Sequence, residues 1–314
     1  MPSKLEVQAV FIPQLVKIDN IMGSKSQKPT VGSCYTFYMK FLIVFLILGI
    51  AALGVVISKN IKVKDTQNPI LPISKILPTP FNPFPYKIPQ IPAKRAYLTY
   101  LVGDSITESL GVNANTLRND LIALYPQNEF VNYNYGFGST NILSLNERLT
   151  KETSYQGSKF PAILDQGFDL IIIESFAYNP LYGGTASENL VKYEEALDEN
   201  IKLIIKSHPD SVVAIMTPIA PNKENFAKYS RDLSPEVRAA WVEERKNYIF
   251  KAIEYAKRNN LPLINVYEKS ADALGNGELI YIDPSDFIHP SKEGIALISK
   301  TISDFIYVNN IFPH

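Results

Sequence analysis

Two short stretches of the 314-residue chain decide its fold class, Leu170-Ile171-Ile172-Ile173 and Val212-Val213-Ala214-Ile215. Each is continuously apolar and rich in β-branched residues, without the alternation of apolar and polar positions that marks a strand with one wet face. Strands of this kind are covered on both faces. They predict a parallel sheet with helices packed on either side.

The chain around these stretches follows the same pattern, in which short β-branched runs alternate with longer amphipathic segments. The sequence predicts five strands, at residues 97–102, 130–135, 169–174, 211–217 and 262–267. It predicts five helices, at residues 114–125, 142–149, 187–206, 235–259 and 291–306. The predicted domain therefore spans residues 96–314 and is a three-layer α/β/α sandwich.

The predicted helix at residues 235–259 has clear signals for its start and for its buried side. Ser234 fits an N-cap, and Pro235 is well suited to the first turn. An apolar stripe that includes Trp241 and Tyr248 recurs at helical spacing. We interpret this stripe as core rather than as a surface that binds a cofactor.

Residues 39–58 are predicted to anchor the chain in a membrane. The segment from Phe41 to Ile57 has no charged residue and is just long enough to cross a lipid bilayer as a helix. A buried core helix and a removed signal peptide are the alternatives. The segment is apolar all round, and no small-residue cleavage pattern follows it, so an uncleaved anchor is favoured. Residues 1–38 have no sustained period and are assigned no domain.

Residues 59–95 are predicted to be a proline-rich spacer between the anchor and the domain. Eight of the 22 prolines of the chain fall between Asp65 and Arg95. Proline fixes φ and removes a hydrogen-bond donor, which favours an extended and semi-rigid chain. A ligand for a proline-recognition domain is the alternative, but the flanking charges that such motifs carry are sparse.

The composition excludes several classes of function. The chain has 31 basic and 31 acidic residues, so it lacks the positive excess of a protein that binds nucleic acid through phosphates. Its single cysteine, Cys34, cannot form an intramolecular disulfide or a cysteine-built zinc site. Only His208, His289 and His314 are present. Any mechanism that uses an imidazole must use one of these three.

Polar residues follow the predicted strands where each strand ends. Ligands in an open parallel sheet bind at this edge, so the loops there are candidate site loops. They comprise residues 103–107, 136–140, 175–179 and 283–289. Each loop alone has a structural explanation, as a turn, a helix cap or a surface segment. Their common position at one sheet edge favours a functional site.

The residue types in these loops point to nucleophilic catalysis. Ser105 follows a strand directly and fits a nucleophile. Among the histidines, only His289 has a carboxylate, Asp286, three positions earlier, and such a carboxylate can orient and stabilise an imidazole base. Gly138 can offer a backbone N–H and Asn179 a side-chain amide, and together with the N–H of Ser105 these form a predicted oxyanion hole.

These blocks resemble those of the GDSL/SGNH hydrolase family over residues 96–306. Gly103-Asp104-Ser105 matches the first block, Gly138 the glycine block, and Asp286-Phe287-Ile288-His289 the last. The third family block is Gly-x-Asn-Asp, whereas this chain has Ala177-Tyr178-Asn179-Pro180. The sequence therefore keeps the asparagine and departs on either side of it.

The resemblance implies a flavodoxin-like sheet with strand order 2-1-3-4-5 and ester chemistry without a metal or organic cofactor. It implies that Ser105, His289 and Asp286 form the catalytic triad. Members of the family act on lipids, aryl esters, acetylated sugars and peptidoglycan, so the substrate stays open. The anchor and spacer favour a single-pass protein of the cell membrane whose domain lies outside the cytoplasm, acting on O-acetyl groups of an envelope carbohydrate.

Two alternatives remain for the function. An acyltransferase would use the same triad with a sugar hydroxyl in place of water, and a catalytically silent module would only bind glycans at the surface. The long connection at residues 219–234 is expected either to wall the substrate pocket or to be a solvated loop.

Overall fold

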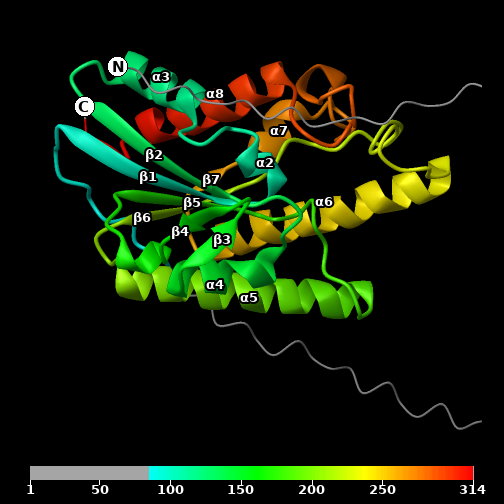
Figure 1. Ribbon diagram of the computed structural model, residues 1–314, viewed down its shortest axis with the longest axis horizontal. Coiled ribbons are helices and arrows are strands. Elements are labelled where there is room, and N and C mark those ends of the chain that lie inside the picture. Colours follow the sequence, from blue (N-terminus) through cyan, green and yellow to red (C-terminus); the bar gives the residue numbers. More distant parts are fainter. Residues whose placement is uncertain (1–84, 314) are drawn as a thin grey trace, which may run out of the picture. The chain divides into compact units, whose positions relative to one another are not determined.

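Five strands form the central sheet in the computed structural model, which describes residues 85–313 (Figure 1). They are β1 (Ala96–Gly103), β2 (Glu129–Gly136), β5 (Leu170–Glu174), β6 (Val212–Met216) and β7 (Leu263–Ile264). All neighbouring pairs are parallel, which confirms the predicted fold class. Each connection between parallel strands must cross over the sheet, and helices supply these crossovers.

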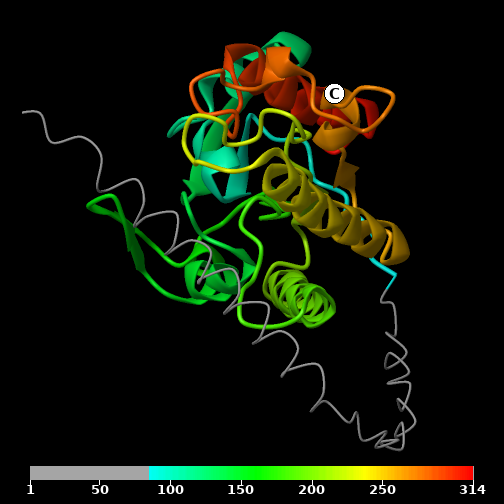
Figure 2. The same cartoon turned by 90° about the vertical axis from the view of Figure 1, so that its right-hand side faces the viewer.

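The strands lie side by side in the order β2-β1-β5-β6-β7. These labels differ from the expected 2-1-3-4-5 because an additional antiparallel hairpin, β3 (Thr153–Tyr155) and β4 (Ser158–Phe160), takes two numbers. The sequence analysis does not predict this hairpin, which projects from the rest of the domain (Figure 2). Among themselves, the five sheet strands lie in the order second, first, third, fourth and fifth along the chain. The strand order reverses around β1, and ligand sites of such sheets lie at this reversal.

Helices cover both faces of the sheet (Figure 1). One face carries α4 (Leu145–Thr150), α5 (Ala186–Ser207) and α6 (Pro235–Arg258), and the other carries α3 (Asn115–Leu124), α7 (Val266–Ser270) and α8 (Lys292–Val308). The short elements are α2 (Ser105–Glu108) and the 3-10 turns η1 (Ile142–Ser144), η2 (Ile163–Asp165) and η3 (Leu279–Tyr281). The predicted three layers are therefore present.

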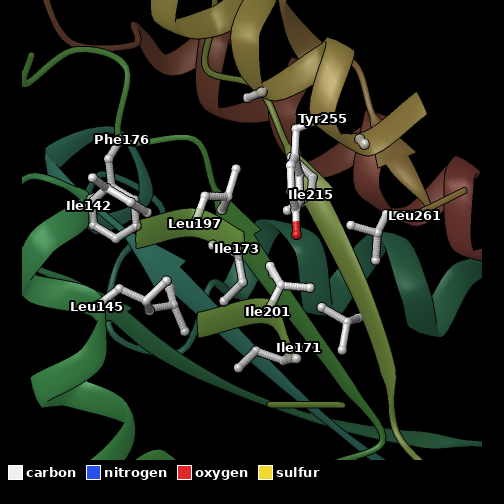
Figure 3. Packing of buried hydrophobic residues seen from close by; sticks show 14 of the residues in the cluster. Ile142, Leu145, Ile171, Ile173, Phe176, Leu197, Ile201, Ile215, Tyr255 and Leu261 are labelled. Carbon is white, nitrogen blue, oxygen red and sulfur yellow. The ribbon is translucent and has the colours of Figure 1, made fainter. Parts of the chain in front are cut away.

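Alternate residues of β5 enter two separate cores. Ile171 and Ile173 pack with Leu197 of α5 on one face (Figure 3). Leu170 and Ile172 belong to the core on the opposite face, with residues of α3 and α8. Burying one such side chain contributes roughly 1.5–3 kcal/mol to folding. An apolar residue is therefore favoured at each of positions 170–173.

Two predicted elements differ in detail from the structure. The predicted helix at residues 142–149 is divided into η1 and α4. The predicted strand at residues 262–267 keeps only the two residues of β7. The chain leaves the sheet there because the side chain of Asn265 accepts the N–H of Glu268 and caps α7.

The described end of the predicted spacer, residues 85–95, packs against the domain. Tyr86 is buried, and its hydroxyl accepts the N–H of Val213 at 3.0 Å and donates to the carbonyl of Ser211 at 3.3 Å. The short strand β7 pairs with β6 only at the last two residues of β6. The Tyr86 hydroxyl therefore satisfies backbone groups at the start of β6 that no neighbouring strand reaches.

The predicted membrane anchor at residues 39–58 lies outside the described residues, as do residues 1–38. Within residues 85–313, no helix is both long enough and apolar enough to span a bilayer.

Candidate active site

The candidate nucleophile Ser105 is the first residue of α2, directly beyond the end of β1. A Cβ on Gly103 would lie 2.1 Å from Thr107 Oγ1, so this close turn requires glycine. Asp104 caps α2, since its Oδ1 accepts the N–H of Ile106 at 2.8 Å. The turn thus holds Ser105 at the carboxyl edge of the sheet. Its hydroxyl makes no hydrogen bond to any residue of the described range.

His289 and Asp286 lie together in the turn between η3 and α8. His289 Nδ1 is 2.5 Å from Asp286 Oδ2, while Asp286 Oδ1 accepts the N–H groups of Ile288 at 2.8 Å and of His289 at 3.1 Å. Phe287 closes the turn in a left-handed conformation, with φ at 56°. The carboxylate therefore orients the ring and leaves Nε2 as the nitrogen available to a substrate.

Hydrogen bonding keeps the Asp286 carboxylate ionised. Burial alone would raise the pKa of Asp286. The bonds from the His289 ring and from the backbone N–H groups of Ile288 and His289 outweigh this effect, and the pKa lies below its ordinary value. A charged carboxylate at this position can stabilise the imidazolium that forms when the histidine takes up a proton.

Ser105 and His289 line the same cavity, whose volume is about 320 Å³. Ser139 and Asn179 line it as well. These four residues come from the four loops that the sequence points to. The structure therefore brings all four candidate loops to one site at the carboxyl edge of the sheet.

Asn179 is placed to donate into the cavity. Its Nδ2 donates one hydrogen to Asp104 Oδ2 at 2.9 Å, and a primary amide has a second hydrogen to offer. The turn that carries it forms in spite of the altered family block, with Phe176 in a left-handed conformation and its carbonyl bonded to the Asn179 N–H at 3.1 Å. The backbone N–H of Ser105 has no acceptor in the described chain and is a second candidate donor.

Gly138 lies beside Ser105, but its N–H is engaged by a residue that the sequence analysis does not single out. A Cβ on Gly138 would lie 3.6 Å from Ser105 Cβ. The N–H of Gly138 donates to the hydroxyl of Tyr155 at 2.8 Å, and Tyr155, on the β3–β4 hairpin, lies 3.0 Å from both carboxylate oxygens of Glu108. The oxyanion role of Gly138 therefore remains a prediction.

A buried pair of acidic side chains lies behind the nucleophile. Asp104 and Glu174 are both fully buried, and the N–H of Asp104 is 3.4 Å from Glu174 Oε2. Burial raises the pKa of Glu174 well above its ordinary value, and the neighbouring Asp104 charge raises it further. Burial also raises the pKa of Asp104, but hydrogen bonds from Ile106 and Asn179 oppose this. Glu174 is thus the member of the pair whose pKa is raised more strongly.

Arg148 supplies the buried positive charge near this pair. Its Nη1 donates to the carbonyls of Gly103 at 2.7 Å and Tyr135 at 2.8 Å, and its guanidinium stacks on Phe137. Burial lowers the pKa of Arg148 to about 10, although the nearby carboxyl groups oppose the shift. The side chain remains charged at neutral pH and ties together the ends of β1 and β2, from which Ser105 and Gly138 follow.

The connection at residues 219–234 walls the cavity, which decides between the two expectations for it. Phe226, Ala227 and Arg231 line the cavity. Arg238 of α6 is buried and donates to the carbonyls of Phe226 and Leu233, so the loop is fixed to the helix.

The first half of α6 also borders the cavity rather than only packing in the core. Trp241 lines the cavity and is only partly buried against the core, and Glu244 and Arg245 line it too. The interpretation of Trp241 as a core residue is therefore correct only in part. This half of α6 extends beyond the sheet, so one of its sides meets the site loops instead of a strand (Figure 1).

The other histidine within the described range lies away from this site. His208 ends α5 near the opposite edge of the sheet, with Nε2 3.1 Å from the carbonyl of Leu164 and its ring 4.3 Å from that of Phe168. His314 is outside the described residues. Residues 85–313 contain no group of three or more His, Cys, Asp or Glu side chains that could hold a metal ion.

Comparison with solved structures identifies proteins of the same architecture. A GDSL-like lipase from Parabacteroides merdae superposes with a TM-score of 0.50 and 16% identity, over 71% of this chain and 100% of that one. The two proteins share a fold. A lipase/acylhydrolase from Enterococcus faecalis gives a TM-score of 0.48 and 19% identity, over 68% and 96% of the chains. An acetyl xylan esterase superposes with a TM-score of 0.42 and 17% identity, over 68% of this chain and 98% of that one. No family model and no curated protein matches the sequence.

Proposed function

We propose that this protein is a serine ester hydrolase of the GDSL/SGNH type. One observation carries the proposal: His289 is paired through Nδ1 with Asp286 at 2.5 Å, and it lines the same cavity as the unengaged hydroxyl of Ser105. A nucleophile, a base and a carboxylate that orients the base are the three groups that acyl transfer through a serine requires. The fold shared with a GDSL-like lipase supports the assignment.

The reaction follows from these positions. Ser105 Oγ attacks the acyl carbon while His289 Nε2 takes its proton, and Asp286 stabilises the resulting imidazolium. The negative oxygen of the tetrahedral intermediate is stabilised by donors near Ser105, namely its own N–H and the amide of Asn179. The alcohol leaves with the proton from His289. A water molecule, deprotonated by His289, then attacks the acyl carbon, and His289 returns the proton to Ser105 Oγ as the bond to the serine breaks and the acid is released.

We further propose that the substrate is an acylated, most simply O-acetylated, carbohydrate outside the cell membrane. The support is the predicted anchor at residues 39–58 with the proline-rich chain after it, which would hold the domain near envelope polymers. The triad could equally pass the acyl group to a sugar hydroxyl. Product analysis with an acetylated polysaccharide and a free glycan acceptor separates hydrolysis from transfer.

Hydrolysis of 4-nitrophenyl acetate by the full chain in detergent tests the proposal. Ser105→Ala is expected to lower kcat by several orders of magnitude without lowering the unfolding temperature. Ser139→Ala is the matched control, because this hydroxyl lines the same cavity but has no place in the triad. Equal activity of Ser105→Ala and the wild type would require another nucleophile.

A further inference from the structure

Arg245 lies in the cavity wall and is buried, which is unusual for a charged side chain. It projects from α6 into the lining of the cavity that holds Ser105 and His289, and the residue is only 8% exposed. Its guanidinium lies 4.8 Å from the ring of Phe226 and 5.2 Å from that of Trp241. These two rings fix the plane of the guanidinium, so that little conformational freedom is lost when a ligand binds.

Most of the hydrogen-bonding capacity of Arg245 is unused. Nη1 donates to the carbonyl of Trp241 at 3.0 Å. Nε is buried without a partner, and Nη2 makes no hydrogen bond to any residue in the described part of the chain. A guanidinium has five N–H donors, and leaving buried donors unpaired is unfavourable. The free donors would be satisfied by an acceptor inside the cavity.

The charges around Arg245 favour an anionic acceptor. Arg231 lines the same cavity and is exposed. Glu244 Oε2 lies 3.7 Å from Arg245 Nη1, too far for a hydrogen bond, and its side chain is 42% exposed. Tyr178 and Tyr182 face the cavity without formal charge, and His289 is engaged with Asp286. The lining of the cavity that holds the nucleophile therefore carries two guanidinium groups and one carboxylate, that of Glu244.

We propose that Arg245, assisted by Arg231, binds a carboxylate of the substrate, so that the preferred substrates are acyl esters of acidic sugars or other hydroxy acids. The inference rests on the proposed ester hydrolysis and specifies its substrate class. A planar carboxylate matches the planar fork of a fixed guanidinium. The nearby Glu244 carboxylate disfavours a doubly charged phosphate more than a singly charged carboxylate.

A matched pair of acetyl esters tests the inference. 4-Acetoxybenzoate and 4-acetoxybenzamide have nearly the same size, and only the first carries a charge. The readout is kcat/KM for 4-acetoxybenzoate divided by kcat/KM for 4-acetoxybenzamide. This ratio is compared between variants, so that the intrinsic reactivity of each ester cancels. Arg245→Lys is expected to lower this ratio about tenfold through KM of the anionic ester, because lysine keeps the charge but not the fork. Arg231→Gln is expected to lower it less.

Glu244→Gln, in the same wall of the cavity, is expected to change this ratio in the opposite direction. It removes the competing carboxylate and should raise the ratio a few-fold. Lys257→Gln is the control, since it removes an exposed positive charge from the same helix outside the cavity and should leave the ratio unchanged. Unfolding temperatures of all variants show whether a change reflects misfolding.

The outcomes separate this inference from the proposed function. Hydrolysis that depends on Ser105, with a ratio that neither Arg245→Lys nor Glu244→Gln changes, would overturn the inference and leave the esterase intact. A larger dependence on Arg245 for 4-acetoxyphenyl phosphate than for the benzoate would also overturn it, in favour of a phosphate site. A wild-type protein that hydrolyses none of these esters would overturn the proposed function and this inference with it.

Discussion

A single short turn places the proposed base and its carboxylate. Asp286 accepts two backbone N–H groups of the turn through one oxygen and contacts the His289 ring through the other. Because His289 follows Asp286 by only three positions, the contact is local to the turn. The spacing of the two residues in sequence is therefore informative about their geometry.

We expect His289→Ala to lower kcat for a small acetyl ester by roughly 10³-fold or more, and Asp286→Ala to lower it less. The base is lost in the first variant, whereas the second loses only orientation and charge stabilisation. Steady-state kinetics with 4-nitrophenyl acetate measures both. His208→Ala is the control, because His208 lies near the opposite sheet edge beside Phe168. Inactivation by His208→Ala with an active His289→Ala would refute the site.

Tyr155 occupies the N–H of Gly138, the backbone donor that the sequence analysis predicts for the oxyanion. Its hydroxyl accepts the N–H of Gly138 and lies beside Glu108. We expect Tyr155→Phe to raise kcat by up to about tenfold, since freeing one N–H for the oxyanion is worth roughly one hydrogen bond. Unchanged kcat would mean that Gly138 does not face the reacting carbonyl and that the N–H of Ser105 and the amide of Asn179 act without it.

At the scale of elements, Glu174, the last residue of β5, is expected to make the free energy of unfolding depend on pH. Glu174 is buried beneath the Ser105 turn, and burial together with the Asp104 charge raises its pKa well above the ordinary value. In the unfolded chain a glutamate releases that proton above about pH 4.3. The folded state therefore binds more protons than the unfolded state. As a result, this group makes the free energy of unfolding fall as pH rises, by up to about 1.4 kcal/mol per pH unit.

Glu174→Gln is expected to reduce this decrease at pH values above about 4.3, because an amide does not titrate. Urea unfolding at several pH values measures the effect. Glu278→Gln, at an exposed position, serves as the control. The same pH dependence in Glu174→Gln and wild type would show that Glu174 is ionised in the folded protein.

The main elements of the fold could be predicted because burial dictates their composition. β6 and the first four residues of β5 are apolar since both faces of the sheet are covered, and α6 begins where Ser234 and Pro235 predict. The β3–β4 hairpin was missed because each of its strands has only three residues, too few for a period to be visible. Its turn is signalled only by Gln156-Gly157, both with positive φ, as a two-residue hairpin turn of type I′ requires.

In the candidate site, too, only the residues that a local sequence pattern reveals could be predicted. Ser105, Asp286 and His289 could be singled out because they follow strands or lie close in sequence. The roles of Tyr155 and Arg245 depend on contacts between distant segments, such as Tyr155 with Gly138, and no local pattern encodes them. From the sequence, Glu174 is only the last residue of a predicted strand. The structure is needed to show that it is buried beside Asp104.

At the scale of the whole molecule, the proposed location depends on the segment before the domain. Protease applied to intact cells is expected to release the domain by cutting between Asp65 and Phe84. Cutting between residues 85 and 95 should be slower, because Tyr86 and Ile91 are buried against the domain. Immunoblotting of the released fragment measures this. Protection of the domain until the cells are lysed would place it inside the cell and remove the envelope substrate.

The central claim is that Ser105 is a nucleophile activated by His289. Reaction with a fluorophosphonate, followed by intact-protein mass spectrometry and peptide mapping, tests it without any assumption about the natural substrate. The account predicts one phosphonyl adduct, located on Ser105, absent in Ser105→Ala and formed much more slowly in His289→Ala. An adduct on another residue, or labelling that Ser105→Ala does not abolish, would contradict the account.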